Sequence, residues 1–291
     1  MIPHVRLLKA FTGHRDAVYA LQPFDDLFLS AGSEGMVVVW DEPPRALLRT
    51  SVPIYAFYAD EKLVVAGQND GKLLFVDLAD NRLASSVKAH QQAVFSIVVV
   101  SSMFVVAGGD GYLSLWERET YAHEGTLAVS AQSLRALAVH PTLPLLAAGG
   151  TDRFIRVFDT NNFSQLASFE AHLSTVFALA FDDDYLYSAG RDARLRKWAV
   201  HEDFNLTQEV MAHHFSIHAL RLSPDGAYLA TGSMDKTIKL WDAADLRLLK
   251  VIDYARHEAH TSSVNTLLWR PDGTLLSSGD DRRILQWAID F

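Results

Sequence analysis

Cysteine is absent from the 291 residues, so the chain can form neither a disulfide nor a thiolate metal site, and it has no cysteine nucleophile. Long apolar runs are absent as well: the longest, residues 97–107, is interrupted by Ser101 and Ser102. Residues 1–6 do not show the basic and then apolar pattern of a signal segment, so we expect none there. Basic side chains are outnumbered, 26 against 35 acidic ones, and the net charge of −9 disfavours general binding to nucleic acid. We therefore expect a cytoplasmic protein with no membrane-spanning segment.

A repeated pattern extends along nearly the whole chain. Tryptophan closes a short apolar run five times, and Val76 and Phe158 stand at the equivalent places of two further copies, at intervals of 36 to 46 residues. The tryptophans are Trp40, Trp116, Trp198, Trp241 and Trp287. An aspartate precedes this position by six residues in six of the seven copies: Asp70, Asp110, Asp152, Asp192, Asp235 and Asp281.

Histidine marks a second position in five copies, 26 to 28 residues before the tryptophan. These are His14, His90, His172, His213 and His260. Each copy then shows short runs rich in Val, Leu, Ile, Phe and Tyr, separated by turn residues such as those at 223–226 and 270–273. Because no segment keeps a helical period, each copy predicts a four-stranded antiparallel sheet.

The spacing and the dipeptides Ala171-His172, Ala259-His260, Trp40-Asp41 and Trp241-Asp242 resemble those of the WD-repeat family of β-propellers. The resemblance covers seven repeats and essentially the whole chain, and it implies an all-β, seven-bladed propeller in a single domain over residues 1–291. The expected blades are residues 14–50, 51–89, 90–129, 130–171, 172–212, 213–253 and 260–291. The last repeat ends after its third strand, so we expect residues 2–10 to pair with it as the fourth strand and close the ring.

A histidine, a hydroxyl, an aspartate and a tryptophan recur together in the last three repeats. They are His172, Ser188, Asp192 and Trp198; His213, Thr231, Asp235 and Trp241; and His260, Ser277, Asp281 and Trp287. A Ser-His-Asp hydrolase would need one exposed constellation with an oxyanion site, whereas three copies beside a tryptophan indicate an internal brace. The family resemblance implies that each set is a buried hydrogen-bond chain. The first repeat, with its Glu34-Gly35 turn, and the third, with Val106 in the hydroxyl position, are expected to be less tightly braced.

Two other kinds of site are disfavoured by the residues present. His213, His214 and His218 cluster in the sequence, as do His257 and His260, but no closed set of metal ligands remains once the braces are assigned. Glycine pairs such as Gly108-Gly109 are explained as turns between strands rather than phosphate loops. We therefore expect no metal and no cofactor.

Binding residues are expected where the first strand of each blade reaches the rim of the central channel. On the family pattern this position follows the aliphatic anchor of the strand, and we call its occupants the seven inner-strand residues: Tyr19, Tyr55, Phe95, Arg135, Phe177, His218 and Asn265. Four of them are aromatic, and aromatic and arginine side chains dominate interface energetics. The alternative is that these rings only fill the channel mouth as core.

Charge is expected to divide between the two faces of the propeller. On the family layout, the turns between second and third strands join the rim and carry Arg153, Arg191, Lys236, Arg282 and Arg283. The turns on the other face carry acidic residues, among them those at 25–26, 60–61 and 182–184.

These patterns predict a non-catalytic scaffold that binds a peptide or protein loop at an aromatic and basic rim, either as a monomer or as a subunit of a larger complex. One alternative is a small-molecule binder or enzyme at the channel mouth, for which His218, Arg135 and Tyr55 are available without a carboxylate pair. A weaker one is a reader of single-stranded nucleic acid that stacks bases on the aromatic rings. The fold alone does not choose between them.

Overall fold

Short hairpins follow one another through nearly the whole chain in this computed structural model, which describes residues 3–291. Over that range the chain forms 28 strands and one single-turn helix. The strands assemble into seven antiparallel sheets of four strands each, which confirms the prediction from the repeat. No helix within residues 3–291 has the length and apolar character needed to cross a membrane.

Contacts divide the chain into two units, and each sheet lies almost entirely in one of them. The first unit comprises the described residues up to 18 together with 140–143 and 171–291, and the second comprises 19–139 and 144–170. The second unit holds four sheets of consecutive strands: β2 (Val18–Phe24), β3 (Leu27–Gly32), β4 (Met36–Val39) and β5 (Arg45–Arg49); β6 (Ile54–Ala59), β7 (Leu63–Gln68), β8 (Lys72–Asp77) and β9 (Arg82–Lys88); β10 (Val94–Val100), β11 (Met103–Gly108), β12 (Tyr112–Glu117) and β13 (His123–Ala128); β14 (Leu134–Val139), β15 (Leu145–Gly150), β16 (Phe154–Asp159) and β17 (Gln165–Glu170).

The first unit holds the remaining three sheets and the helix. Its elements are β18 (Val176–Phe181), β19 (Tyr185–Gly190), β20 (Arg194–Ala199) and β21 (Asn205–Met211); β22 (Ile217–Leu222), β23 (Tyr228–Ser233), β24 (Ile238–Asp242) and β25 (Leu248–Ile252); α1 (Tyr254–His257); and β26 (Val264–Trp269), β27 (Leu275–Gly279) and β28 (Ile284–Asp290) with β1 (His4–Phe11).

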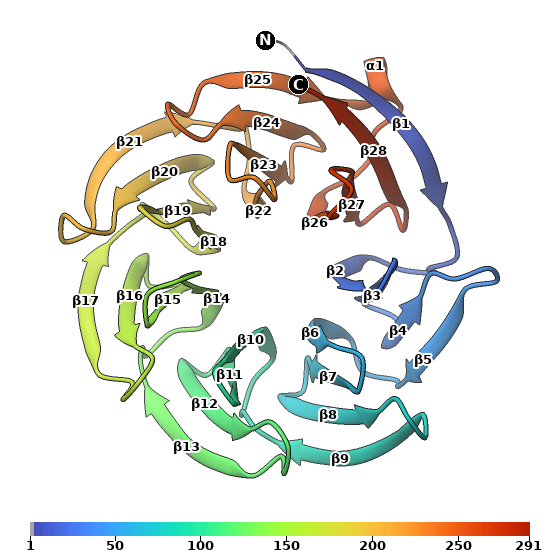
Figure 1. The fold of residues 1–291 in the computed structure, drawn as a ribbon, viewed down its shortest axis with the longest axis vertical. Coiled ribbons are helices and arrows are strands. Elements are labelled where there is room, and N and C mark those ends of the chain that lie inside the picture. The colour runs from blue at the N-terminus through green and yellow to red at the C-terminus, as the bar shows by residue number, and fades with distance from the viewer. Residues whose placement is uncertain (1–2) are drawn as a thin grey trace. The chain divides into compact units, whose positions relative to one another are not determined.

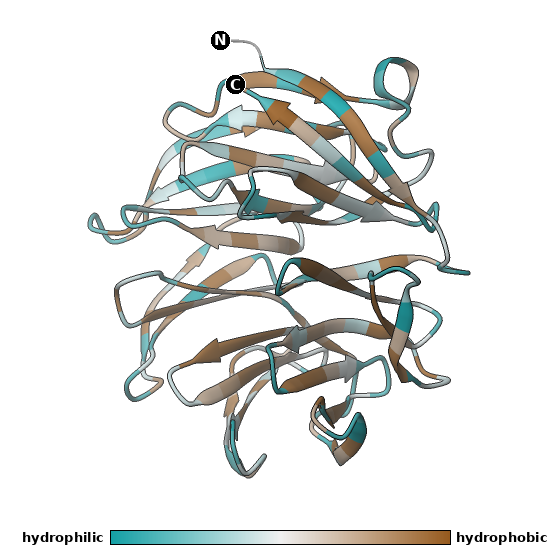
Figure 2. Ribbon diagram, turned by 45° about the vertical axis from the view of Figure 1, so that its right-hand side comes forward, coloured by the Kyte–Doolittle hydropathy of each residue, from teal (hydrophilic) through white to brown (hydrophobic). Residues whose placement is uncertain are grey.

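Burial decreases from the second strand of a sheet to the last, and the sequence follows this change. All six residues of β7 are buried, as are five of the six in β15, so these strands read as continuous apolar runs. The last strands, such as β17, alternate between exposed and half-buried positions. The outer strand that starts at the N mark in Figure 2, β1, shows the same alternation as teal and brown segments.

Neighbouring sheets within a unit share their apolar residues. Phe57 and Val64 of the second sheet pack with Leu29 and Val39 of the first, and Leu220 packs with Tyr187 in the first unit. The first strands of neighbouring sheets therefore come together at one edge, which we call the inner edge of each unit. In the second unit β2, β6, β10 and β14 lie along this edge, and β5, β9, β13 and β17 lie at the opposite edges of their sheets (Figure 1).

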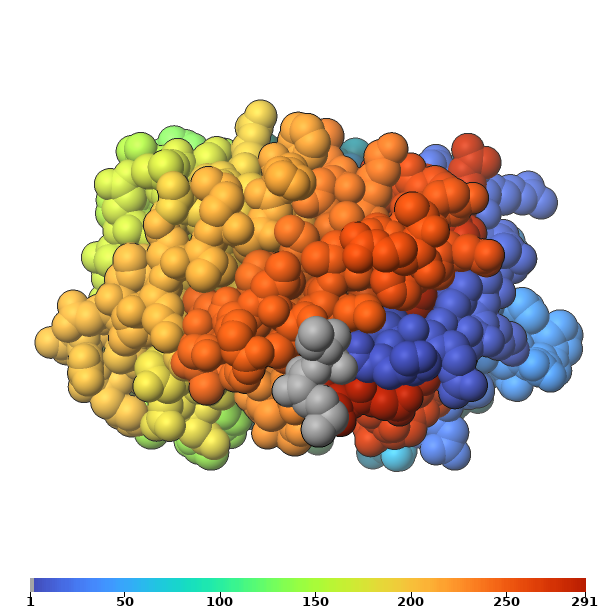
Figure 3. Space-filling view, turned by 90° about the horizontal axis from the view of Figure 1, so that it is seen from above, coloured from blue at the N-terminus to red at the C-terminus, as the bar shows by residue number. Residues whose placement is uncertain are grey.

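The last sheet takes its fourth strand from the beginning of the chain. β1 pairs antiparallel with β28, from His4 opposite Asp290 to Phe11 opposite Ile284, with one irregularity between Leu7 and Lys9. In Figure 3 the dark blue atoms of β1 lie against the red and orange atoms of the C-terminal segments. The predicted pairing is confirmed; residue 2 of the predicted segment lies outside the described residues.

One turn position is left-handed in all seven sheets, directly after the repeated aspartate or Glu34. Glycine occupies it in the first three sheets, and a Cβ at Gly71 or Gly111 would lie about 2 Å from a backbone carbonyl oxygen. Four other sheets carry side chains there despite the positive φ: Arg153, Ala193, Lys236 and Arg282. These four residues adopt a left-handed backbone conformation, which is energetically unfavourable for L-residues.

Candidate functional site

The seven inner-strand residues share one local geometry. Each follows a fully buried aliphatic residue at the start of a first strand, and each is itself half-buried, so none is core and none is fully exposed. In six of the seven sheets the register shifts at this residue, as between Ile54 and Ala56 around Tyr55 and between Val94 and Ser96 around Phe95. The other four shifts fall at Arg135, Phe177, His218 and Asn265. Because a β-bulge re-aims its side chain, these residues leave the alternation of their strands.

In the second unit four of these side chains contact one another in a row. The ring centroids of Tyr19 and Tyr55 are 5.0 Å apart, and those of Tyr55 and Phe95 are 5.5 Å apart with planes 27° from parallel. The guanidinium carbon of Arg135 lies 3.7 Å from the centroid of the Phe95 ring. We call these four residues the aromatic column. It runs along the inner edge across β2, β6, β10 and β14.

Arg135 ends this column as a cation without a counter-ion. Its Nε is buried and has no hydrogen-bond partner, and its guanidinium forms no ion pair with any of the described residues. Burial lowers the pKa of Arg135, against a small opposing effect of Tyr55. An arginine remains protonated despite such a shift, so a positive charge is held at the end of the column.

The inner-strand residues of the first unit are tied to their own neighbours. The rings of Phe177 and His218 meet edge to face, with centroids 5.2 Å apart. His218 Nδ1 lies 3.2 Å from Ser263 Oγ. Asn265 donates from Nδ2 to the carboxylate of Asp280 at 2.7 Å and to the carbonyl of residue 18 at 3.2 Å.

The basic turn residues differ in how far they are neutralised. Arg153 pairs with Glu170 at 3.1 Å, and Arg283 pairs with Asp281 at 3.0 Å. Arg191, Lys236 and Arg282 are exposed, and their side chains form no ion pair with any residue from 3 to 291. The acidic turns between first and second strands lie at the opposite end of their antiparallel sheets.

The sequence patterns did not predict three exposed apolar side chains in the first unit. Leu173, Phe215 and Met234 are 69%, 59% and 53% exposed. They lie in the loops before β18 and β22 and in the turn after β23, at the same end of their sheets as Arg191 and Lys236. The only signal in the sequence is a large apolar residue just after a brace histidine or just before its aspartate.

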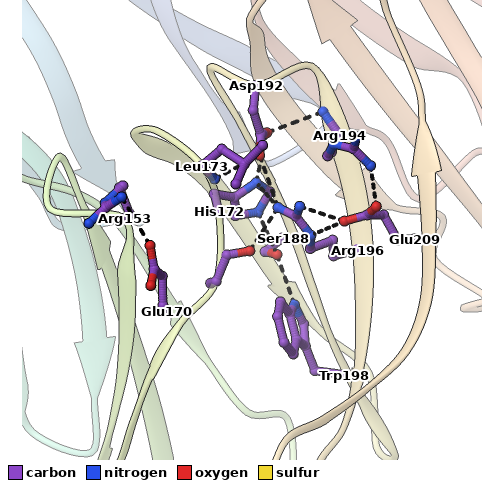
Figure 4. Close-up of polar contacts among 11 residues, drawn as sticks. Arg153, Glu170, His172, Leu173, Ser188, Asp192, Arg194, Arg196, Trp198 and Glu209 are labelled. Carbon is purple, nitrogen blue, oxygen red and sulfur yellow. Dashed lines mark hydrogen bonds and ion pairs between the residues drawn. The ribbon is translucent and has the colours of Figure 1, made fainter.

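The brace is complete in the last three sheets, and Figure 4 shows it for β18–β21. Trp198 donates from Nε1 to Ser188 Oγ at 2.9 Å, and Ser188 Oγ lies 2.8 Å from His172 Nε2. His172 Nδ1 lies 2.9 Å from the carboxylate of Asp192, which also accepts the backbone N–H of Leu173. The same bonds recur among His213, Thr231, Asp235 and Trp241 and among His260, Ser277, Asp281 and Trp287.

Burial keeps two of the histidines in these hydrogen-bond chains neutral. It lowers the pKa of His172 and of His213, so both imidazoles are neutral near pH 7. If a neutral His172 donates from Nδ1 to Asp192, its Nε2 carries no proton and must accept the hydrogen bond that the Ser188 hydroxyl donates. Burial by itself would raise the pKa of Asp192, but the bonds from His172, Leu173 and Arg196 outweigh it and hold that pKa below its usual range. The Ser188 hydroxyl is 0% exposed and fully engaged, so a substrate cannot reach it.

Comparison with known proteins matches this architecture to one family. The sequence model of the "WD domain, G-beta repeat" fits residues 5–41, 121–159, 163–199, 204–242 and 253–288, which together make up more than half of the chain. The chain belongs to the WD40-repeat family. The WD40 β-propeller domain of Doa1 is similar over 98% of this chain and 97% of its own, with a TM-score of 0.86 at 16% identity. That likeness shows the fold, a seven-bladed β-propeller.

Curated WD40 relatives are similar at lower coverage of their own length. Protein tipD of Dictyostelium discoideum is 24% identical across 96% of this chain and 48% of its own. Human Striatin is 28% identical across 79% of this chain and 27% of its own. This chain thus spans about half or less of the relatives that it matches. A computationally designed protein, Ika8, has a TM-score of 0.76 at 26% identity, covering 94% of this chain and 84% of its own.

The third WD40 repeat corrects one expectation. Val106 was expected to leave this sheet loosely braced, yet Trp116 donates to Ser114 Oγ at 2.8 Å and Ser114 Oγ lies 2.9 Å from His90 Nε2. His90 Nδ1 in turn lies 2.9 Å from Asp110. Ser114 stands directly opposite Val106 across β11 and β12, and opposed residues share one face of a sheet. The hydroxyl has moved to the facing strand, and the brace is intact.

Two WD40 repeats lack the histidine, and other side chains form the polar contacts at that position. In β14–β17, Asp152 accepts a hydrogen bond from Ser130 Oγ at 2.8 Å and pairs with Arg156 at 2.7 Å. In β6–β9, Gln68 donates from Nε2 to Thr50 Oγ1 at 2.9 Å. The polar link between the entry loop and the strands is therefore kept with other side chains.

The part of the chain that the structure describes has no cluster of metal ligands. No three His, Asp or Glu side chains among residues 3–291 are placed to hold a metal ion. An open cavity of about 350 Å³ lies beside α1 in the first unit. Its lining includes His260 and Asp235, both already engaged in braces, with Lys236, Thr237, Asp253, Tyr254 and Thr261.

Proposed function

We propose that this WD40 propeller is a non-catalytic protein-interaction module that binds a peptide or a protein loop through its inner-strand residues. The aromatic column supports this proposal most directly. Three aromatic rings in contact and an unneutralised guanidinium are half-buried side by side. Tyr55, Phe95 and Arg135 each sit in a bulge that takes the side chain out of the strand's alternation.

The energetics of such a surface favour a protein partner. Aromatic rings bury a large area with few rotamers to lose, and the aromatic column has already fixed their orientation. Preorganisation lowers the entropy cost of binding. The first unit offers a second surface of similar composition, where the exposed Leu173 and Phe215 accompany the unpaired Arg191 and Lys236.

Catalysis has less support from the side chains present. The hydroxyl that joins histidine to tryptophan in each of the last three repeats is buried within a brace, namely Ser188, Thr231 and Ser277. Thr237, whose hydroxyl also lies beside His213, is half-buried and donates that hydroxyl to the Asp235 carboxylate at 2.6 Å. A hydrolase would need its nucleophile open to substrate. The net charge of −9 weighs against a nucleic-acid partner. The cytoplasmic location stays a prediction, which microscopy of the tagged protein in its native host would test.

The test replaces inner-strand aromatics without touching a brace. We expect Phe95→Ala combined with Phe177→Ala to leave the thermal unfolding of the propeller cooperative. It should weaken binding of the natural partner at least about tenfold, because hot-spot aromatics each contribute 1–2 kcal/mol or more. Partners would be captured from the native host with the wild-type chain, identified by mass spectrometry, and then measured by calorimetry as purified proteins.

Tyr112→Ala serves as the matched control, because Tyr112 is an exposed aromatic on the third strand of its sheet rather than the first. It should leave the affinity unchanged. A partner that binds the double variant as tightly as the wild type would remove the inner-strand residues from consideration. Loss of binding with both the double variant and Tyr112→Ala would point to a surface elsewhere.

A further inference from the structure

Two arginines of one sheet, β14–β17, differ in their electrostatic surroundings. Arg156 lies near the ring of Phe154, its guanidinium carbon 5.5 Å from the centroid, and it pairs with Asp152 at 2.7 Å. Arg135 lies closer to its ring, 3.7 Å from the centroid of Phe95, and it has no carboxylate. The same sheet thus holds one neutralised guanidinium and one that is not.

The unneutralised guanidinium is in a costly position. Arg135 is half-buried, and its Nε is buried without an acceptor. A buried donor that lacks a partner costs roughly 1–3 kcal/mol, and more when it is charged. The ring of Phe95 covers one face of the guanidinium, which leaves the edge with its N–H groups as the place for an acceptor.

We propose that Arg135 is an anion-recognition residue that binds the carboxylate of an aspartate or glutamate in the partner segment, while the rings of Tyr55 and Phe95 contact an apolar residue beside it. This inference rests on the proposed function and names the chemistry of the segment. A carboxylate fits because it is planar and takes two parallel N–H bonds from one guanidinium. A phosphate would call for a cluster of cations, and the aromatic column contains one.

Phe95 holds the guanidinium for this contact in advance of binding. An arginine in solution loses much rotamer entropy when it is ordered, whereas one stacked on a ring has already lost it. The carboxylate would gain charge-assisted bonds from the terminal N–H groups of the guanidinium, which are not buried as its Nε is. Binding would therefore be selective for an acidic side chain next to an apolar one.

The experiment uses an array of peptide pairs and the full chain. The peptides are twelve residues long, acetylated and amidated so that they carry no terminal charge, and each pair has a central Phe or Leu flanked by Glu in one member and Gln in the other. We expect the wild type to bind the best Glu peptide about tenfold more tightly than its Gln partner, which corresponds to about 1.4 kcal/mol. Affinities would be confirmed by calorimetry.

Three variants locate the effect. Arg135→Gln should remove the preference for Glu while keeping weaker, ring-dependent binding. Arg135→Lys keeps the positive charge without the planar guanidinium and should keep only part of the preference for Glu. This variant also controls for a folding defect in the glutamine variant. Arg82→Gln removes one positive charge from the same unit, at an exposed residue on the last strand β9 that is paired with Asp80, and should change nothing.

Each alternative outcome has a distinct meaning. Equal binding of the Glu and Gln members by the wild type would overturn the role of Arg135 and leave the proposed function standing. The same conclusion follows if Arg135→Gln keeps the preference. A phosphoserine peptide that outcompetes its Glu counterpart through Arg135 would overturn the carboxylate assignment. Failure of the wild type to bind any pair, together with unchanged partner binding by the Phe95 and Phe177 double variant, would overturn both proposals.

Discussion

The sheets β14–β17 and β18–β21 have the same strands at the same spacing but hold their loops to those strands in different ways. In β18–β21, Asp192 joins His172 to Arg196, and the chain of bonds continues through Ser188 to Trp198. In β14–β17, the corresponding Asp152 joins Ser130 to Arg156, and the chain stops there. The aspartate and the arginine four residues later are common to both sheets.

The comparison distinguishes two contributions to each repeat, which are the pairing of its strands and the satisfaction of its buried polar groups. Four-stranded pairing is the same in both sheets, so it follows from strand pattern and turns rather than from the brace. The brace instead satisfies the polar groups that lie between the entry loop and the third strand. A sheet that lacks histidine and tryptophan needs another donor for its aspartate and an apolar residue in place of the indole, and Ser130 and Phe158 supply them.

Removing the aspartate from a braced sheet should have the largest effect. Asp281 holds His260 at 2.9 Å and Arg283 at 3.0 Å, so Asp281→Ala is expected to lower the free energy of unfolding by about 3 kcal/mol, because it leaves a buried histidine and an arginine unpaired. Asp70 occupies the same repeat position without a histidine, and its one ion pair among residues 3–291 is with Lys72, at 3.3 Å. Asp70→Ala should therefore cost about 0.5 kcal/mol or less. Urea unfolding of both variants measures the difference, and equal losses would contradict a role for the brace.

Exchanging the aromatic residues between the two kinds of sheet should have an intermediate effect. Trp198→Phe removes the donor to Ser188 and should cost about 1–2 kcal/mol. Phe158→Trp adds an indole N–H in a sheet where Ala148 stands at the position of the hydroxyl residue Ser188, so the N–H would lack its acceptor and the change should cost about 2 kcal/mol. Adding Ala148→Ser to Phe158→Trp should recover about 1 kcal/mol of that loss. A double variant no more stable than Phe158→Trp alone would show that the hydroxyl does not decide the choice of aromatic.

Acid should produce the smallest effect and should act through the braced sheets. The pKa of His172 and of His213 is lowered from 6.5 by burial, so the unfolded chain binds more protons than the folded chain once the pH falls below 6.5. Stability should be complete above that pH and should decline as the pH falls toward the folded pKa values. The depressed pKa of Asp192 and of Asp235 adds a further loss below the ordinary range of a carboxyl.

Urea midpoints measured between about pH 7.5 and about pH 5 would test this dependence. Combining His172→Gln with His213→Gln should flatten the dependence in that interval. The matched change His201→Gln, at a 62% exposed histidine outside the braces, should not. An unchanged slope in the double variant would assign the acid sensitivity to other groups.

The sequence was sufficient for the repeat, the seven four-stranded sheets and the partner of β1, because each depends on spacing or on an unpaired strand. It was misleading at Val106, where a pattern read at one position cannot show a hydroxyl on the facing strand. It located the seven inner-strand residues without the bulges that turn them, since a bulge depends on the register between two strands. The stacking of Arg135 on Phe95 joins residues 40 positions apart in different sheets, and no local pattern encodes such a contact.

The pairing of β1 with β28 also sets an order of events during synthesis. β1 is synthesised before the other strands of the propeller, and its partner β28 is the last of them. For most of translation β1 therefore presents an unpaired strand edge, which is an opportunity for wrong pairing. Its charged and polar positions, His4, Arg6 and Lys9, lie on the exposed side of the strand and would keep that edge soluble until β28 arrives. The last sheet is completed only when the two ends of the propeller meet, so its completion is a late step that the earlier sheets do not have to wait for.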